Sequence, residues 1–459
     1  MKRMMTRSLI LWFVTFAVLA GMIFLGVKTV IFSGDWVQQP FNGHMASAGG
    51  LSKAGDIYDR NQKVLAYSEN DERHYSDDYM TREALLHVVG DGSLNISTAI
   101  QSRYLTGLSG YNFALGIGLP ESLRPNSDLT LTIDADACRE AYSMLNGHKG
   151  ACVVYNYLTG AVLCDISAPS YDPADPPTIT EENESDYDGV YLDNVVSSTF
   201  TPGSVFKIIT AAAAIENIPD IYGQSFTCYG SLDVEGSAIT CEDAHGTQSF
   251  YEAFSNSCNC AFGEIAMQVG ETAMKETAEK LGFNSSEFRM SDIPIATSHY
   301  DAVGAGENFL AWSGIGQYEN LANPMLMAMI SSAVANGGTA TAPYIVEDDG
   351  SLMDKLNISV NKGKDVSMLS PTTAAKLKEL MSGSADSYAY RGISIAGLPF
   401  CAKTGTAEVG EDKEPTAWFV GFIDDVAHPY AFAAVVVEGG YGIDAAAPVV
   451  SAAINELVY

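Results

Sequence analysis

The chain has 459 residues, of which 47% are hydrophobic and 18% charged, a composition typical of a globular protein with two or three domains. The formal net charge of −31 argues against binding to nucleic acid, because proteins that bind it present a basic surface to the phosphates. The acidic excess otherwise favours solubility and indicates no particular function.

The N-terminal segment differs from the rest of the sequence. An apolar run without a charged residue extends from Leu9 to Val27, and Lys2, Arg3 and Arg7 precede it. This run is long enough to cross a bilayer as one helix, and the basic residues favour a cytoplasmic N-terminus. A cleaved signal peptide is the alternative, which the bulky residues after the run disfavour. We therefore predict a cytoplasmic tail and transmembrane anchor at 1–32, with the remainder outside the cell membrane.

The rest of the chain divides into two predicted modules. Residues 33–126 mix a Gly-rich linker with short strand-like and helix-like pieces, and 127–459 alternate longer elements. Strand patterns lie at both ends of the second module and helical patterns in its middle, which predicts an α+β domain. In chain order we expect a strand at 129–134, a helix at 135–145, and two strands within 151–167 joined by a turn at Leu158-Thr159-Gly160. Helices at 204–216, 250–269, 272–281 and 324–335 follow, then strands at 400–407, 416–424 and 430–439, and a helix at 448–457.

Eight cysteines are compatible with an extracellular protein. Cys228 and Cys241 flank a predicted hairpin and could form a disulfide, although spacing alone does not determine the partners. The sequence has no CxxC pair and no histidine–cysteine cluster at the usual spacing of metal ligands. We therefore expect no zinc, no other metal and no cofactor.

A Ser-x-x-Lys pattern joins Ser204 and Lys207 at the expected start of an apolar helix. Residues three apart lie on the same side of a helix, so the lysine can reach the serine hydroxyl. A second copy of the pattern, from Ser359 to Lys362, lies in a polar stretch that we interpret as a surface loop. A lysine acts as a base only when burial or a nearby cation lowers its pKa.

Two further patterns complete a possible site. Lys403-Thr404-Gly405-Thr406 is expected on a strand, where a second lysine could lower the pKa of Lys207 and a glycine would admit a neighbouring backbone. Ser257-Cys258-Asn259 precedes an apolar helix. These polar residues could be a helix N-cap, or they could relay a proton and orient a substrate amide.

The order SxxK, SxN, KTG is similar to that of penicillin-binding proteins, and with the segments GDIYDR (55–60), GIGQ (314–317) and AWFVGF (417–422) the chain resembles a class B penicillin-binding protein. The resemblance implies a penicilloyl-serine transferase domain, with an antiparallel sheet flanked by helices, above a small pedestal and one transmembrane helix. It also implies catalytic roles for Ser204, Lys207, Ser257, Asn259 and Lys403, substrate binding by Thr404, Gly405 and Thr406, and an oxyanion hole made by the backbone N–H groups of Ser204 and Thr406.

The function implied by the resemblance is peptidoglycan D,D-transpeptidation. Stem peptides ending in D-Ala-D-Ala would acylate Ser204, and β-lactams would block it covalently. A D,D-carboxypeptidase, a β-lactamase-like hydrolase and a catalytically silent cell-wall scaffold remain alternatives. The family also implies a membrane glycan polymerase as a partner.

Overall fold

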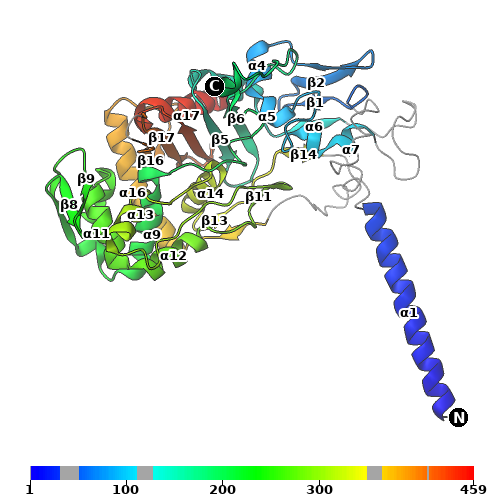
Figure 1. Ribbon diagram of the computed structural model, residues 1–459, viewed down its shortest axis with the longest axis horizontal. Coiled ribbons are helices and arrows are strands. Elements are labelled where there is room, and N and C mark those ends of the chain that lie inside the picture. Colours follow the sequence, from blue (N-terminus) through cyan, green and yellow to red (C-terminus); the bar gives the residue numbers. More distant parts are fainter. Residues whose placement is uncertain (1, 32–50, 111–127, 349–363, 411–412) are drawn as a thin grey trace.

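The computed structural model describes residues 2–31, 51–110, 128–348, 364–410 and 413–459 (Figure 1). Helix α1 (Lys2–Ile31) contains the segment Arg7–Lys28, which is long and apolar enough to cross a membrane and has no buried residue. This confirms the expected apolar helix, which is compatible with a membrane anchor or a signal sequence. The second Ser-x-x-Lys copy at Ser359 lies outside the described residues, as does most of the Gly-rich linker.

A small five-stranded sheet lies near the N-terminal end of the described globular part. Its strand order is β14-β4-β1-β2-β3, with β1 and β4 parallel and the other pairs antiparallel. The bounds are β14 (Val346–Asp348), β4 (Leu129–Leu131), β1 (Ile57–Tyr58), β2 (Val64–Glu69) and β3 (Glu72–Tyr75), and the short helices α4 (Tyr79–Ala84), α5 (Leu86–Val89), α6 (Ile100–Arg103) and α7 (Leu105–Leu108) follow. Two of these strands therefore come from the segment that we assigned to the second module, and the division at 126 stays a prediction.

The GDIYDR segment connects this sheet to the main domain. The buried carboxylate of Asp59 accepts hydrogen bonds from the backbone N–H groups of Asn61 and Lys63, both at 2.8 Å. It also accepts a longer bond of 3.3 Å from the N–H of Ala135, the first residue of α8 (Ala135–Met144). Because a buried carboxylate needs such donors, the motif holds the start of α8 against the small sheet.

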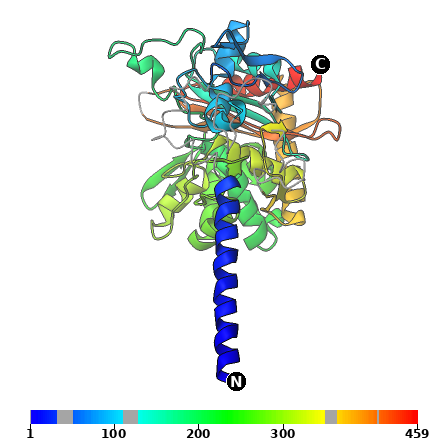
Figure 2. The same ribbon diagram turned by 90° about the vertical axis from the view of Figure 1, so that its right-hand side faces the viewer.

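The main sheet is antiparallel and is built from both ends of the domain. Its order is β16 (Phe400–Ala407), β17 (Thr416–Ile423), β18 (Tyr430–Val436), β5 (Gly150–Asn156) and β6 (Val162–Ala168). All residues of β17 and β18 are buried, so helices cover both faces. Helices α8 and α17 (Gly442–Val458) pack together on one face, and α14 (Pro324–Ala335) packs on the other (Figures 1 and 2). This agrees with the predicted α+β class.

The last helix is longer than expected. We predicted its start at Pro448, but it begins at Gly442 and contains the proline. A Cβ on Gly442 would lie 2.3 Å from the Trp418 carbonyl oxygen and 2.7 Å from that of Gly405, so the helix start rests directly on the backbone of the sheet. This close packing determines where the helix starts. The start could not be predicted from local sequence signals, because the packing partners lie on distant strands.

A helical lobe lies beside the β16 edge of the main sheet (Figure 1). Its helices are α9 (Lys207–Asn217), α10 (Phe250–Ser255), α11 (Asn259–Val269), α12 (Glu271–Lys280), α13 (Glu307–Gly314) and α16 (Pro371–Tyr390). Its strands are β7 (Ser225–Cys228), β8 (Ser231–Val234), β9 (Ser237–Thr240) and β10 (Gly246–Ser249). Two short strand pairs complete the fold, β11 (Arg289–Met290) with β12 (Ile293–Pro294) and β13 (Thr339–Ala340) with β15 (Val366–Ser367). The prediction of a single helix at 250–269 is wrong. The helix is interrupted between α10 and α11, at Ser257, whose φ is 52°.

Candidate active site

Ser204 lies in a short 3-10 turn, η3 (Gly203–Phe206), directly before α9. We expected an α-helix from Ser204, but the α-helix starts at Lys207. The turn is tight because Gly203 has a φ of 54° and its N–H donates a 2.9 Å hydrogen bond to the carbonyl of Gly316 in the GIGQ segment. A side chain at Gly203 would collide with the Thr406 carbonyl oxygen at 2.7 Å, so the turn packs closely between this segment and β16.

Lys207 is fully buried, and its side-chain nitrogen contacts Ser204, Ser257 and Asn259. Its Nζ lies 3.0 Å from Ser204 Oγ, 2.7 Å from Asn259 Oδ1 and 3.2 Å from Ser257 Oγ. It also donates a 2.6 Å hydrogen bond to the Ser257 carbonyl oxygen. The SxxK and SxN motifs therefore meet at one nitrogen atom.

The SxN motif forms the break between α10 and α11. Cys258 is the N-cap of α11, with its Sγ accepting a hydrogen bond from the Ala261 N–H. Ser257 is therefore not the cap, and its left-handed backbone turns its hydroxyl toward the lysines. Asn259 is held by a 2.8 Å hydrogen bond from its Nδ2 to the carbonyl of Thr240, at the end of β9.

Lys403 approaches the same hydroxyl from β16. Its Nζ lies 2.9 Å from Ser257 Oγ and 3.2 Å from the Thr404 carbonyl oxygen, and the side chain is fully buried. Burial lowers the pKa of Lys403 to about 7. Burial and then the charge of Lys403 lower the pKa of Lys207 to about 7. At neutral pH a large share of Lys207 is therefore the free amine that can accept a proton.

The rest of the KTG strand is divided between the cleft and the core. Thr404 and Thr406 are half-buried and line the cleft, whereas Gly405 is buried beneath the η3 turn. A Cβ on Gly405 would lie 2.8 Å from the Pro202 carbonyl oxygen. We expected the glycine to admit a neighbouring backbone, and the backbone that approaches belongs to this chain.

Sequence reasoning missed Tyr388 of α16. Its hydroxyl accepts a 3.1 Å hydrogen bond from the Thr404 N–H and a 3.0 Å bond from Thr404 Oγ1. Burial raises the pKa of Tyr388, so it stays a neutral phenol. No local pattern marks this tyrosine, because only packing of α16 on β16 places it beside the strand.

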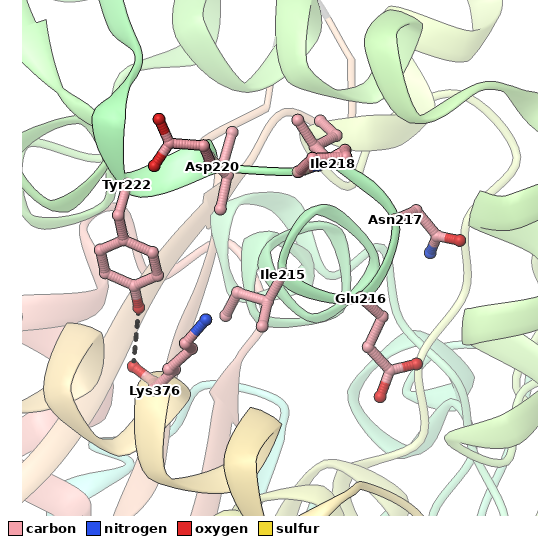
Figure 3. Close-up of a pocket in the computed structure, with 9 residues that line it drawn as sticks. Ile215, Glu216, Asn217, Ile218, Asp220, Tyr222 and Lys376 are labelled. Carbon is pink, nitrogen blue, oxygen red and sulfur yellow. Dashed lines mark hydrogen bonds between the residues drawn. The ribbon is translucent and has the colours of Figure 1, made fainter.

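A cleft of about 600 Å³ is lined by Ser204, Ser257, Asn259, Tyr388, Thr404 and Thr406, with Trp312, Arg391 and Tyr441 on its other walls. A second pocket, of about 280 Å³, lies at the opposite end of α9 from Lys207 (Figure 3). In Figure 3 its walls are Ile215, Glu216 and Tyr222 with Lys376, and Tyr222 donates a 3.4 Å hydrogen bond to the Lys376 carbonyl. It contains no serine or cysteine beside a base, so the Ser204 cleft is the candidate active site.

The expectations for the cysteines need correction. Cys228 and Cys241 form no disulfide, since all eight thiols are free. The sequence shows no histidine–cysteine cluster at the usual spacing of metal ligands, but in the structure Cys228, Cys241, Cys258 and His245 converge. The spacing of these residues hid the cluster, since the end of β7, the loop between β9 and β10 and the start of α11 bring them together.

A serine hydroxyl beside a buried lysine is an arrangement found in serine acyltransferases. Residues 150–455 match the sequence model described as the penicillin binding protein transpeptidase domain. The chain therefore belongs to the penicillin-binding protein transpeptidase family, as the three motifs predicted. It is 33% identical over 331 residues to peptidoglycan D,D-transpeptidase PbpA of Mycobacterium tuberculosis, a match that covers 68% of this chain and 66% of the relative. It is 25% identical over 400 residues to stage V sporulation protein D of Bacillus subtilis, covering 78% of this chain and 58% of that protein.

Among solved structures, the chain is similar to the ceftriaxone acyl-enzyme complex of penicillin-binding protein A from M. tuberculosis. The TM-score is 0.75 at 26% sequence identity, and the match covers 90% of this chain and 100% of that structure. That structure is a covalent complex, so this mycobacterial relative forms an acyl-enzyme with a β-lactam.

Proposed function

We propose that this chain is a serine-type peptidoglycan D,D-transpeptidase in which Ser204 is the nucleophile. The observation that carries the proposal is the position of the buried Lys207 Nζ, 3.0 Å from Ser204 Oγ and in contact with Ser257 and Asn259. A lysine base with a lowered pKa beside a serine hydroxyl is the arrangement that nucleophilic catalysis requires.

In the proposed reaction, Ser204 Oγ attacks the carbonyl carbon between the two D-alanines of a stem peptide and gives its proton to neutral Lys207. The C–N bond then breaks, and the terminal D-alanine leaves with a proton supplied through Ser257, whose hydroxyl contacts both lysines. An amine from a second stem peptide attacks the ester, so that a new amide forms and the serine regains its proton.

The remaining groups would bind the substrate. Asn259 would hold its amide, and Lys403 with the hydroxyls of Thr404 and Thr406 would bind its terminal carboxylate at the edge of β16, where Gly405 lets the η3 turn pack closely. The backbone N–H groups of Ser204 and Thr406 would stabilise the oxyanion. β-Lactams, which acylate the mycobacterial relative, would acylate the same serine.

The family and the apolar N-terminal helix support proposals for the location and the partner. We propose a single-pass anchor at 1–32 with a cytoplasmic N-terminus, a pedestal at 33–126 and an extracellular catalytic domain at 127–459. A membrane glycan polymerase is the proposed partner, which co-purification from membranes would test.

Mass spectrometry of the full chain after incubation with benzylpenicillin tests the chemistry. We expect a single covalent adduct on the peptide that contains Ser204, and none in Ser204→Ala. An adduct on another residue, or on the Ser204→Ala variant, would overturn the assignment. Rapid turnover of nitrocefin, without accumulation of the adduct, would instead favour the hydrolase alternative.

A further inference from the structure

Four side chains of the kinds that bind zinc converge beside the active-site cleft. Cys228 ends β7, Cys241 follows β9, His245 precedes β10 and Cys258 is the N-cap of α11. Their ligand atoms all lie within 4.8 Å of one another. The Sγ atoms of Cys241 and Cys258 are 3.7 Å apart, close to the separation of about 3.8 Å that a tetrahedral zinc with bonds of about 2.3 Å imposes on two sulfurs.

The surroundings of these atoms fit a metal. His245 Nδ1 is buried and has no hydrogen-bond partner among the described residues, which is costly unless another ligand satisfies it. Cys241 Sγ accepts hydrogen bonds from the backbone N–H groups of Asn259 at 3.1 Å and Cys260 at 3.4 Å. Backbone donors of this kind stabilise the negative charge of a metal-bound thiolate.

A disulfide explains the cluster less well. Cys241 Sγ lies 3.7 Å from the sulfur of Cys258 and 3.5 Å from that of Cys260, with neither sulfur preferred. A disulfide would also leave the ring nitrogen of His245 without a partner. Cys260 Sγ donates to the Ile239 carbonyl at 3.8 Å, as Cys228 Sγ does to the Asp243 carbonyl at 3.8 Å, and of these two sulfurs only that of Cys228 belongs to the group of four converging ligand atoms. The set of three cysteines and one histidine is a known composition of closed structural zinc sites.

We propose that Cys228, Cys241, His245 and Cys258 bind a structural zinc ion that positions the Ser257–Asn259 segment. Binding releases the thiol protons of the three cysteines as the zinc–thiolate bonds form. Four protein ligands leave no open position, so the ion performs no chemistry on the substrate.

The site is joined directly to the catalytic groups. Cys258 lies between Ser257, whose hydroxyl contacts both lysines, and Asn259, whose amide contacts Lys207. The ion would join this loop to the segment after β9, and thereby hold Ser257 in its left-handed conformation with a φ of 52°. The effect of the ion on acylation of Ser204 rests on the proposed function. The binding of zinc by the four side chains does not depend on it.

Elemental analysis of the full chain, purified in detergent without added metal, tests the binding. We expect about one zinc per chain, and less than about a tenth of that in Cys241→Ser and in His245→Gln. The matched controls are Cys260→Ala, next to the cluster, and Cys401→Ala, in the buried strand β16, and both should keep the ion. Cobalt added to the stripped wild-type protein should give thiolate charge-transfer bands and intense tetrahedral d–d bands.

Several results would overturn the zinc proposal. They are wild-type protein that neither contains nor binds zinc, a disulfide of Cys241 found by peptide mapping in place of the metal, and retention of zinc by His245→Gln. His245→Gln is the milder variant, because the side chain is only half-buried, and its circular dichroism shows whether it folds.

The positioning role is tested separately by the rate of labelling with fluorescent penicillin. Removal of zinc with a chelator should slow acylation at least about tenfold, and added zinc should restore it in the wild type but not in His245→Gln. An unchanged rate after complete removal would overturn the positioning role. A protein that binds zinc and never labels Ser204 would instead contradict the proposed function.

Discussion

Two fully buried lysines lie on either side of the Ser257 hydroxyl, and neither has a carboxylate partner among the hydrogen bonds and ion pairs of the described residues. Their positive charges would repel each other, so the site favours the state in which at least one is neutral. The aromatic ring of Phe262 lies 5.7 Å from Lys207 Nζ, and that of Phe254 lies 5.9 Å from Lys403 Nζ. These rings stabilise whichever lysine carries the proton.

Acylation should therefore depend on pH through Lys207. Because its pKa is lowered to about 7, the fraction of free amine, and with it the rate of penicillin acylation, should rise as the pH increases through 7 and then level off. Stopped-flow measurement of the second-order rate constant checks this. Lys403→Met removes the neighbouring charge and should move the profile to higher pH, in addition to any loss of rate.

Lys207→Arg provides the matching control. A guanidinium stays charged throughout this pH range, so the variant should bind penicillin without being acylated. A variant that is acylated with the wild-type pH profile would show that Lys207 is not the base.

A buried carboxyl group, that of Asp165, affects the pH dependence of stability. Both carboxylate oxygens of Asp165 in β6 are buried without a hydrogen-bond partner among the described residues. Burial, and then the neighbouring Asp193, Cys138 and Cys152, raise the pKa of Asp165 well above its usual value. The folded state thus keeps a proton that the unfolded chain releases above its ordinary pKa of about 4, so stability falls as the pH rises from there.

Asp165→Asn should remove this dependence. We expect the free energy of unfolding of the variant to change less between about pH 5 and pH 8, with a gain relative to wild type of about 1–3 kcal/mol at the higher pH. Urea unfolding at both pH values measures it. Equal slopes against pH for the two proteins would contradict the prediction.

At the scale of elements, the contact between η3 and β16 sets the position of Ser204, the proposed nucleophile. The Trp418 indole of β17 donates a 2.9 Å hydrogen bond to the Thr201 carbonyl, and Gly405 lies directly below Pro202. The segment that leads into the turn is thus fixed to two strands, through the indole of Trp418 and the backbone at Gly405. A small shift of the η3 turn against these strands would change the distance between Ser204 Oγ and Lys207 Nζ.

Gly405→Ala should disturb this contact. The new Cβ would lie 2.8 Å from the Pro202 carbonyl oxygen and 3.0 Å from Val205 Cγ1, so the turn must shift. We expect a loss of about 1–3 kcal/mol in unfolding free energy and at least about tenfold slower acylation. Gly107→Ala in α7 is the control, because a Cβ on Gly107 would have nothing within 4 Å. Acylation of Gly405→Ala at the wild-type rate would contradict a positioning role for the turn.

The motifs predicted much of the site because their spacing is local. Ser204 and Lys207 share a turn, and Lys403 to Thr406 share a strand, so sequence order sets their geometry. The break at Ser257 was missed because a left-handed serine has no propensity signal. Tyr388 and the cluster around Cys241 were missed because their contacts join segments that lie far apart in the sequence.

At the scale of the whole molecule, composition and hydrophobic patterns predicted the α+β class and the apolar N-terminal helix. They did not predict that β4 and β14 join the small N-terminal sheet. Such pairing depends on which edges meet after the domain has packed, which propensity does not encode. The two modules are consequently linked through hydrogen bonds between strands as well as through the chain itself.

The central position of β18 in the main sheet also determines when the protein can fold during synthesis. Strand β5, made early, pairs with β18, whose residues 430–436 lie close to the C-terminus. The early strands must therefore remain without their partner until nearly all of the chain has been translated, and contacts so distant in sequence form slowly. During this interval the apolar β5–β6 hairpin is exposed to aggregation, so holdase chaperones should matter more for the yield of this protein than for one whose sheet forms from consecutive strands.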